Sequence, residues 1–164
     1  MPRVPFAQLP DDARVWVFAS ASELATPASN RLLEAVDDFL TAWNAHGSPL
    51  VGARDWRDDR FLAVGVDQST AGASGCSIDG LFRTFARLEP ELGTKLLGSA
   101  RVFYRDATGQ VRVVSRSMFG ELAKAGTVSA ETPVFDTSLT SAAAWREEFE
   151  RPARQSWHAE LMPR

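Results

Sequence analysis

Residues 50–67 read LVGARDWRDDRFLAVGVD, and this stretch decides the fold of the first half of the chain. Two segments rich in apolar residues, Leu50–Trp56 and Phe61–Asp67, flank the charged tetrapeptide Arg57-Asp58-Asp59-Arg60. Short apolar segments on either side of a polar turn are typical of paired β-strands. The second segment is almost entirely apolar, so we expect it to be a central strand.

Helical patterns lie on both sides of these two strands. Residues 27–46 repeat apolar side chains at helical spacing, with Thr26 as the expected N-cap and Gly47 just beyond the last turn. Residues 78–88 carry a second apolar stripe after a loop of small residues. We therefore expect a helix before these two strands in the sequence and a second helix after them.

The first strand is expected at Arg14–Ala19, which is apolar on both faces and reads as a buried central strand. Adding Arg101–Arg105 as a last strand gives the order β-α-β-β-α-β, the ferredoxin-like arrangement. The sequence thus predicts an α+β fold in which residues 1–98 form a ferredoxin-like domain.

The second half of the chain has a different pattern. Arg101–Arg105 and residues 110–114 alternate apolar and polar residues around Asp106–Gly109, which is typical of a β-hairpin. A short helix capped by Ser115 or Ser117, a short strand at 133–135 and a helix at 141–150 are expected to follow. We interpret residues 99–164 as a small hairpin-and-helix module whose tail packs back on the body.

Composition excludes several classes of protein. Apolar residues make up 45% of the 164 and charged residues 24%, the balance of a folded chain, and the formal net charge is -3. This charge argues against a general nucleic-acid partner, and no apolar run is long enough to cross a membrane. A single cysteine and the lack of a signal-peptide pattern favour a cytoplasmic location.

The single cysteine, Cys76, is the first candidate for chemistry. It lies in the glycine-rich stretch Gly72–Asp79, just before the second expected helix. A thiol at a helix start can react as a thiolate, because the helix dipole favours negative charge there. The structural alternative is that Cys76 is a small buried residue and that Ser77 or Asp79 caps the helix.

A catalytic cysteine normally needs a base, and His46 is one of only two histidines in the chain. We expect His46 at the C-terminus of the first helix. We further expect that end of the helix to lie at the opposite end of the sheet from Cys76, which disfavours a Cys–His pair. His158, in the tail, has no expected position.

The same loop offers a second hypothesis, a site for a small anion. Backbone N–H groups at a helix start can surround a phosphate or carboxylate, and hydroxyl groups can assist them. The expected ligand-binding residues are Ser74, Gly75, Cys76, Ser77 and Asp79, with Ser69 and Thr70 as further hydroxyl donors. Loops of small residues are also common as plain connections, so this alternative remains open.

Residues 102–145 contain hairpin, helix, glycine-turn and late aromatic elements in a recognisable order. The matching residues are Phe103-Tyr104, Gly109-Gln110, Val114-Ser115, Phe119, Leu122, Gly126-Thr127-Val128, Thr132-Pro133-Val134-Phe135 and Trp145. This stretch resembles the small bacterial GYF-2-type module and departs from it at Val111-Arg112 and Phe135-Asp136. The resemblance implies a protein-interaction unit related to domains that bind proline-rich peptides.

A second set of short motifs is spread along the whole chain: Leu9-Pro10-Asp11, Arg14-Val15-Trp16, Ala45-His46-Gly47, residues 73–79 and Ser156-Trp157. In these residues the chain resembles an uncharacterised bacterial family of similar length, whose members are sometimes labelled as transporter ATPases. The label finds no support here, because the chain lacks the GxxxxGK[ST] loop that holds a nucleotide phosphate.

These patterns favour a non-enzymatic interaction or small-ligand-binding module, with a protein or peptide as partner. No cofactor and no metal site is expected. The alternative is a thiol-dependent or anion-binding enzyme in which Cys76 is the nucleophile and His46 its base.

Overall fold

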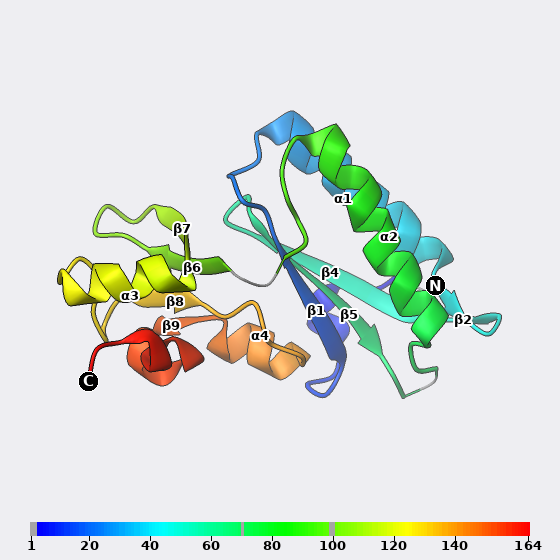
Figure 1. Ribbon diagram of the computed structural model, residues 1–164. Coiled ribbons are helices and arrows are strands. Elements are labelled where there is room, and N and C mark those ends of the chain that lie inside the picture. Colours follow the sequence, from blue (N-terminus) through cyan, green and yellow to red (C-terminus); the bar gives the residue numbers. More distant parts are fainter. Residues whose placement is uncertain (1–2, 70, 99–100) are drawn as a thin grey trace. The chain divides into compact units, whose positions relative to one another are not determined.

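A computed structural model of the chain describes residues 3–69, 71–98 and 101–164 (Figure 1). Four α-helices and several antiparallel sheets occur in these residues, which confirms the α+β class. By their contacts the residues divide into two units. Unit 1 comprises Met1–Leu97 and Ser138–Trp145, and unit 2 comprises Gly98–Thr137 and Arg146–Arg164.

The sheet of unit 1 is built on the two strands expected at its centre. β4 (Val51–Arg57) and β5 (Phe61–Asp67) pair antiparallel around the charged turn. Asp58 and Asp59 have positive φ angles of 56° and 51°, and the N–H of Arg60 donates to the Arg57 carbonyl at 3.1 Å. This is the geometry of a type I′ turn, whose twist matches that of the flanking strands.

β1 (Arg14–Ala19) adds to the other side of β5, so the strand order is β1-β5-β4. β5 is therefore central, as predicted, and its residues from Phe61 to Val66 are all buried. The expectation that β1 is also central is wrong, because the described residues place no further strand of this sheet beyond it.

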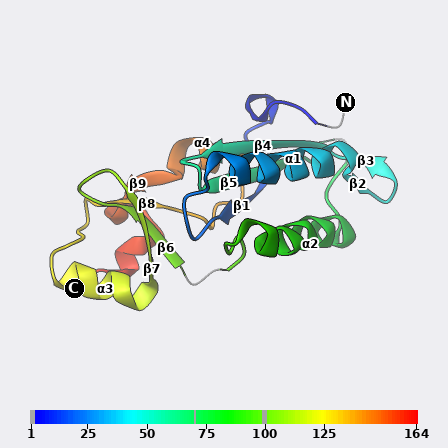
Figure 2. The same ribbon diagram turned by 90° about the horizontal axis from the view of Figure 1, so that it is seen from above.

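Two helices cover one face of the sheet: α1 (Thr26–Ala42) and α2 (Gly75–Leu92). They lie side by side in both views (Figures 1 and 2). Phe18 of β1 stacks on Phe85 of α2 with ring centroids 3.9 Å apart. The buried core between helices and sheet includes Leu32, Val36, Leu40, Leu62, Val64, Leu81 and Leu88.

The first helix ends earlier than predicted. α1 stops at Ala42, and Ala25 rather than Thr26 is its N-cap, with Pro27 in the first turn. The chain then forms a small hairpin of β2 (Asn44–Ala45) and β3 (Ser48–Pro49). His46 and Gly47 form its two-residue loop with φ angles of 52° and 81°, again the type I′ geometry.

The face of the sheet opposite the helices is covered by segments from two parts of the chain. The short 3-10 helix η1 (Phe6–Gln8) precedes Leu9, whose side chain packs so closely on Gly65 that a Cβ there would lie 2.6 Å from it. The second segment is Ser138–Trp145, which includes the first residues of α4 (Ala142–Glu148). Val15 donates its N–H to the Thr140 carbonyl at 2.9 Å.

Trp145 anchors this second segment and is fully buried. Its indole Nε1–H donates to the Asp55 carboxylate of β4 at 2.8 Å. Arg57 bonds the same carboxylate at 3.1 Å, and its guanidinium carbon lies 4.3 Å from the centroid of the indole ring. Hydrogen bonding, cation–π attraction and apolar burial therefore combine at one side chain.

Unit 2 contains the predicted hairpin, helix and short strand. Its antiparallel sheet has the order β7-β6-β8-β9, from β6 (Arg101–Arg105), β7 (Val111–Ser115), β8 (Pro133–Phe135) and β9 (Glu150–Pro152). Ser115 caps α3 (Arg116–Lys124) by accepting the Met118 N–H at 3.1 Å. The short helices η2 (Ala153–Gln155) and η3 (Trp157–Leu161) follow, and the core includes Val102, Tyr104, Phe119, Val128, Val134 and Ala153.

The ferredoxin-like arrangement is not confirmed. Its fourth strand was expected to be Arg101–Arg105, but this segment pairs with β7 and β8 in the sheet of unit 2. The expected division into residues 1–98 and 99–164 stays a prediction about independent folding. Contacts assign Ser138–Trp145 to unit 1, and residues 99 and 100 lie outside the described part of the chain.

Within the described ranges, no helix combines the length and the apolar character needed to cross a bilayer.

Substitution of Trp145 tests its role as an anchor. Trp145→Ala is expected to lower the free energy of unfolding of unit 1 by about 3–5 kcal/mol, because a large buried side chain is lost. Trp145→Phe keeps most of the apolar contact but removes the donor to Asp55, so a loss of about 1–2 kcal/mol is expected. Urea denaturation measures both, with Met118→Ala, which changes an exposed side chain, as the control. If Trp145→Phe had the same urea midpoint as the parent protein, the hydrogen bond from Trp145 to Asp55 would not be stabilising.

Candidate functional site

The loop expected to bind an anion is organised by the helix that follows it. Ser74 is the N-cap of α2, and its hydroxyl accepts the Ser77 N–H at 3.2 Å. In return the Ser77 hydroxyl accepts the Ser74 N–H at 2.7 Å, which completes a capping box. The Ser77 hydroxyl also donates to the Ser74 carbonyl at 2.8 Å, and that carbonyl accepts the Ile78 N–H at 2.9 Å.

The capping box uses groups that the anion hypothesis requires. The N–H groups of Ser77 and Ile78 are bonded to Ser74, so an anion would have to displace an internal partner. Gly75, Cys76 and Asp79 are exposed on the first turn of α2. Thr70, also expected to contribute a hydroxyl, lies outside the described residues. The geometry explains the serine spacing as a cap, and the anion site stays a prediction.

Cys76 and His46 are both exposed, and their parts of the chain meet. The indole Nε1–H of Trp43, the C-cap of α1, donates to the Ser77 carbonyl in the first turn of α2 at 2.9 Å. The end of α1 and the start of α2 therefore lie at the same end of unit 1, and the expectation that they lie at opposite ends is wrong. Each helix runs antiparallel to the strand before it, and β1 and β5 are themselves antiparallel, so the two helices point in opposite directions.

His46 is not at a helix terminus, contrary to expectation. It occupies the exposed turn between β2 and β3, where the left-handed backbone is set by the hairpin rather than by a site. No group of three or more histidine, cysteine, aspartate or glutamate side chains in the described residues is arranged to hold a metal ion. A thiol enzyme with His46 as base thus remains a prediction.

The surface between α1 and α2 is hollowed, at residues that the sequence analysis does not single out. Two adjoining hollows of about 650 and 370 Å³ share Phe39, Thr84 and Arg87 as lining residues, and together we call them the α1–α2 groove. The larger hollow is completed by Gly80, Arg83 and Ala86. The smaller one is completed by Arg31, Ala35, Asp38, Leu88 and Glu91.

The α1–α2 groove has an apolar wall and a charged rim. The half-buried ring of Phe39 faces Gly80, where an added Cβ would lie 3.7 Å from the ring. Arg83 and Arg87 are exposed one helical turn apart on α2. The hydroxyl of Thr84 is already bonded to the Gly80 carbonyl at 2.9 Å, so it adds surface to the groove rather than a free donor.

One local feature of the sequence indicates this groove. Gly80 interrupts a good helix, and a glycine in a helix interior costs about 1 kcal/mol relative to alanine, so it needs a reason. Arg83 and Arg87 follow at positions that place them on the same side of the helix as Gly80. Phe39 is some 40 residues away, and only the folded chain brings it to this face.

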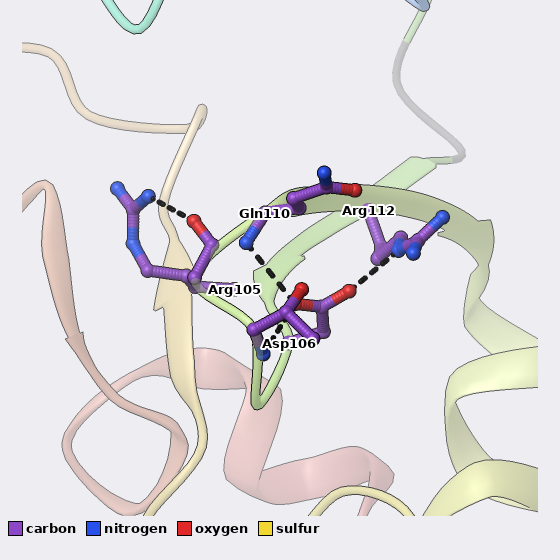
Figure 3. Close-up of polar contacts among 6 residues, drawn as sticks. Arg105, Asp106, Gln110 and Arg112 are labelled. Carbon is purple, nitrogen blue, oxygen red and sulfur yellow. Dashed lines mark hydrogen bonds and ion pairs between the residues drawn. The ribbon is translucent and has the colours of Figure 1, made fainter.

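In unit 2 the hairpin between β6 and β7 is fixed by one carboxylate. Asp106 accepts hydrogen bonds from the hydroxyl of Thr108 at 2.6 Å and the N–H groups of Thr108 and Gln110 at 2.9 and 3.0 Å. Arg112 bonds its other oxygen at 2.7 Å (Figure 3). These donors, above all Thr108 and then Arg112, hold the pKa of Asp106 far below its usual range. Asp106 thus links the residues of the turn to one another.

His158 is buried in the core of unit 2 beside Phe119. Its Nδ1 shares a hydrogen bond of 2.8 Å with the Ser156 hydroxyl, while Nε2 is buried without a partner in the described residues. Burial lowers the pKa of His158 to about 4, since a charged imidazole would lose its hydration there. Nearby Arg116 favours the same direction and Asp136 opposes it. The imidazole is therefore neutral near pH 7.

Comparison with known proteins yields no match. No protein-family model fits the chain, and searches of curated proteins and of solved structures find no significant similarity. The resemblances to the GYF-2-type module and to the bacterial family therefore stay predictions.

The exposed position of Cys76 leads to a direct expectation for its thiol. In the native protein it should react with a disulfide reagent such as dithionitrobenzoate to the same extent as in guanidinium chloride, because Cys76 is an exposed residue. Cys76→Ser should change the free energy of unfolding by less than about 0.5 kcal/mol. A thiol that reacts only after denaturation would contradict its exposure.

The burial of neutral His158 makes the stability of unit 2 depend on pH. The unfolded chain takes up a proton below pH 6.5, whereas the folded imidazole resists protonation down to about pH 4. The free energy of unfolding should therefore be unaffected by this group above pH 7 and fall by roughly 3 kcal/mol as the pH drops to 4. His158→Asn, which keeps a polar atom near Ser156 but does not titrate, should lack this component. Equal pH profiles for parent and variant would contradict the assignment.

Proposed function

We propose that this protein is a non-enzymatic, cytoplasmic interaction module that binds a segment of a partner protein in the α1–α2 groove. The observation that carries the proposal is the groove itself, with its phenylalanine wall, its helical glycine and its two exposed arginines. An apolar wall with a few polar groups at the rim is the usual build of a site that holds a peptide or small ligand.

The charged groups of the larger hollow support binding rather than catalysis. Arg83 and Arg87 are the charged residues that line it. A guanidinium stays protonated at all physiological pH values, so it positions an acceptor but does not shuttle protons. Thr84, the hydroxyl residue of the hollow, is bonded to its own helix.

Unit 2 supports the same class of function. Its resemblance to the GYF-2-type module implies protein interaction, and the order of hairpin, helix and short strand is compatible with that module. β7 lies at the end of its sheet, and no strand of the described residues pairs with its outer edge. Val111 and Val113 are half-exposed along it. Such an edge suits the addition of an extended segment.

A nuclear magnetic resonance titration tests the proposal. A pool of short peptides of mixed sequence is added to ¹⁵N-labelled protein, and shift changes are expected to cluster on Gly80, Arg83, Thr84 and Arg87. Gly80→Leu should abolish them, because its side chain enters the hollow while leucine favours the helix more than glycine does.

The matched control is Lys124→Leu, which places the same side chain on the exposed surface of α3. It should leave the shift changes intact. Shift changes that lie away from the α1–α2 groove, or that survive in Gly80→Leu, would contradict the proposal.

A further inference from the structure

The two halves of the α1–α2 groove differ in charge. The larger hollow is lined by Arg83 and Arg87 with no acidic residue. The smaller hollow has two arginines, Arg31 and Arg87, balanced by Asp38 and Glu91. The groove is therefore positive at the end nearer the start of α2 and close to neutral at the other end.

Arg83 and Arg87 also differ from other arginines of this unit in having no ionic partner. Arg31 bonds Glu91 at 3.0 Å, and Arg54 makes a two-pronged contact to Asp37 at 2.8 and 2.9 Å. No ion pair to Arg83 or Arg87 occurs among the described residues. Like charges one helical turn apart repel each other and destabilise a helix. A negative group bound between them removes that repulsion.

The apolar wall of the groove favours an apolar side chain in the ligand, in addition to the negative charge that the arginines favour. The space above Gly80 is bounded by the ring of Phe39, so an apolar side chain fits there next to the two guanidinium groups. Guanidinium groups bind carboxylates in a planar, two-pronged geometry. The occupant that satisfies both features carries a carboxylate within one helical turn of an apolar side chain.

We propose that the α1–α2 groove recognises an acidic segment of a partner protein, with its carboxylates at Arg83 and Arg87 and an apolar side chain against Phe39. This inference rests on the proposed function, because it names the chemistry of the segment bound there. A nucleic acid fits less well, since Asp38 and Glu91 line the same groove and the chain has a formal net charge of -3.

The experiment compares two probe peptides that differ only in charge. One is a short capped peptide with two glutamates one helical turn apart around a leucine, and its twin has glutamine at both positions. Each is titrated into ¹⁵N-labelled full-length protein at low and high salt. The double variant Arg83→Gln/Arg87→Gln is compared with Lys124→Gln, which removes an exposed helical charge in unit 2. Glutamine preserves helix propensity in all of them.

The glutamate peptide is expected to shift the signals of Gly80, Arg83 and Thr84 and to bind about tenfold more tightly than its twin. The double variant should lose this preference, Lys124→Gln should keep it, and salt should weaken it because exposed charges are screened.

Equal affinity for the two peptides at the groove would overturn the inference and leave the proposed function standing. No shift at the groove with either peptide, or a response there to a single-stranded oligonucleotide but not to the glutamate peptide, would overturn it as well. If the double variant still preferred the glutamate peptide, residues other than Arg83 and Arg87 would bind the carboxylates, and the inference would be overturned.

Discussion

The contact between Trp145 and β4 is the constraint on which unit 1 depends. The indole is fully buried, bonded to Asp55 and stacked under Arg57, and it lies about 90 residues from them in sequence. Through this contact a short segment of the second half of the chain covers the sheet face opposite the helices. The helices α1 and α2 then occupy the other face, and their outward sides form the α1–α2 groove.

The local elements could be read from the sequence because local signals specify them. The charged turn between β4 and β5, the hairpin around Asp106 and the serine cap of α3 all lie within a few residues of the strands or helix that they define. The end of α1 was misread because the apolar stripe continues through Trp43. The helix instead ends at Ala42, and His46 and Gly47 adopt left-handed backbone angles in the loop of the β2–β3 hairpin.

The pairing of strands and the contacts between distant segments could not be predicted from the sequence in the same way. Arg101–Arg105 has the pattern of a strand in either sheet, and alternation alone does not say which partner it pairs with. It pairs with β7, which a tight turn holds next to it, rather than with β1 far away in sequence. The role of Trp145 was missed for a similar reason, since an aromatic residue in a helix gives no sign of a carboxylate on a distant strand.

The candidate sites also divide into one that nearby residues in the sequence form and one that distant residues form. The spacing of Ser74 and Ser77 was visible and is explained as a capping box, which gives the small-residue loop a structural role. The α1–α2 groove was not visible, because Phe39 and the arginines of α2 meet only after folding. The sequence does show a glycine followed by two arginines on one face of α2. Only the folded structure shows that Phe39 of α1 lies opposite them.

Native-state hydrogen exchange of the Val15 amide tests most directly whether the segment around Trp145 is part of unit 1. This N–H donates to Thr140, so it is protected only while residues 138–145 stay in place. The free energy of its exchange should lie within about 1 kcal/mol of that of Val64 in central β5, which requires unfolding of the whole unit. Exchange at Val15 several kcal/mol easier than at Val64 would mean that the segment detaches while the sheet persists, and would contradict this organisation.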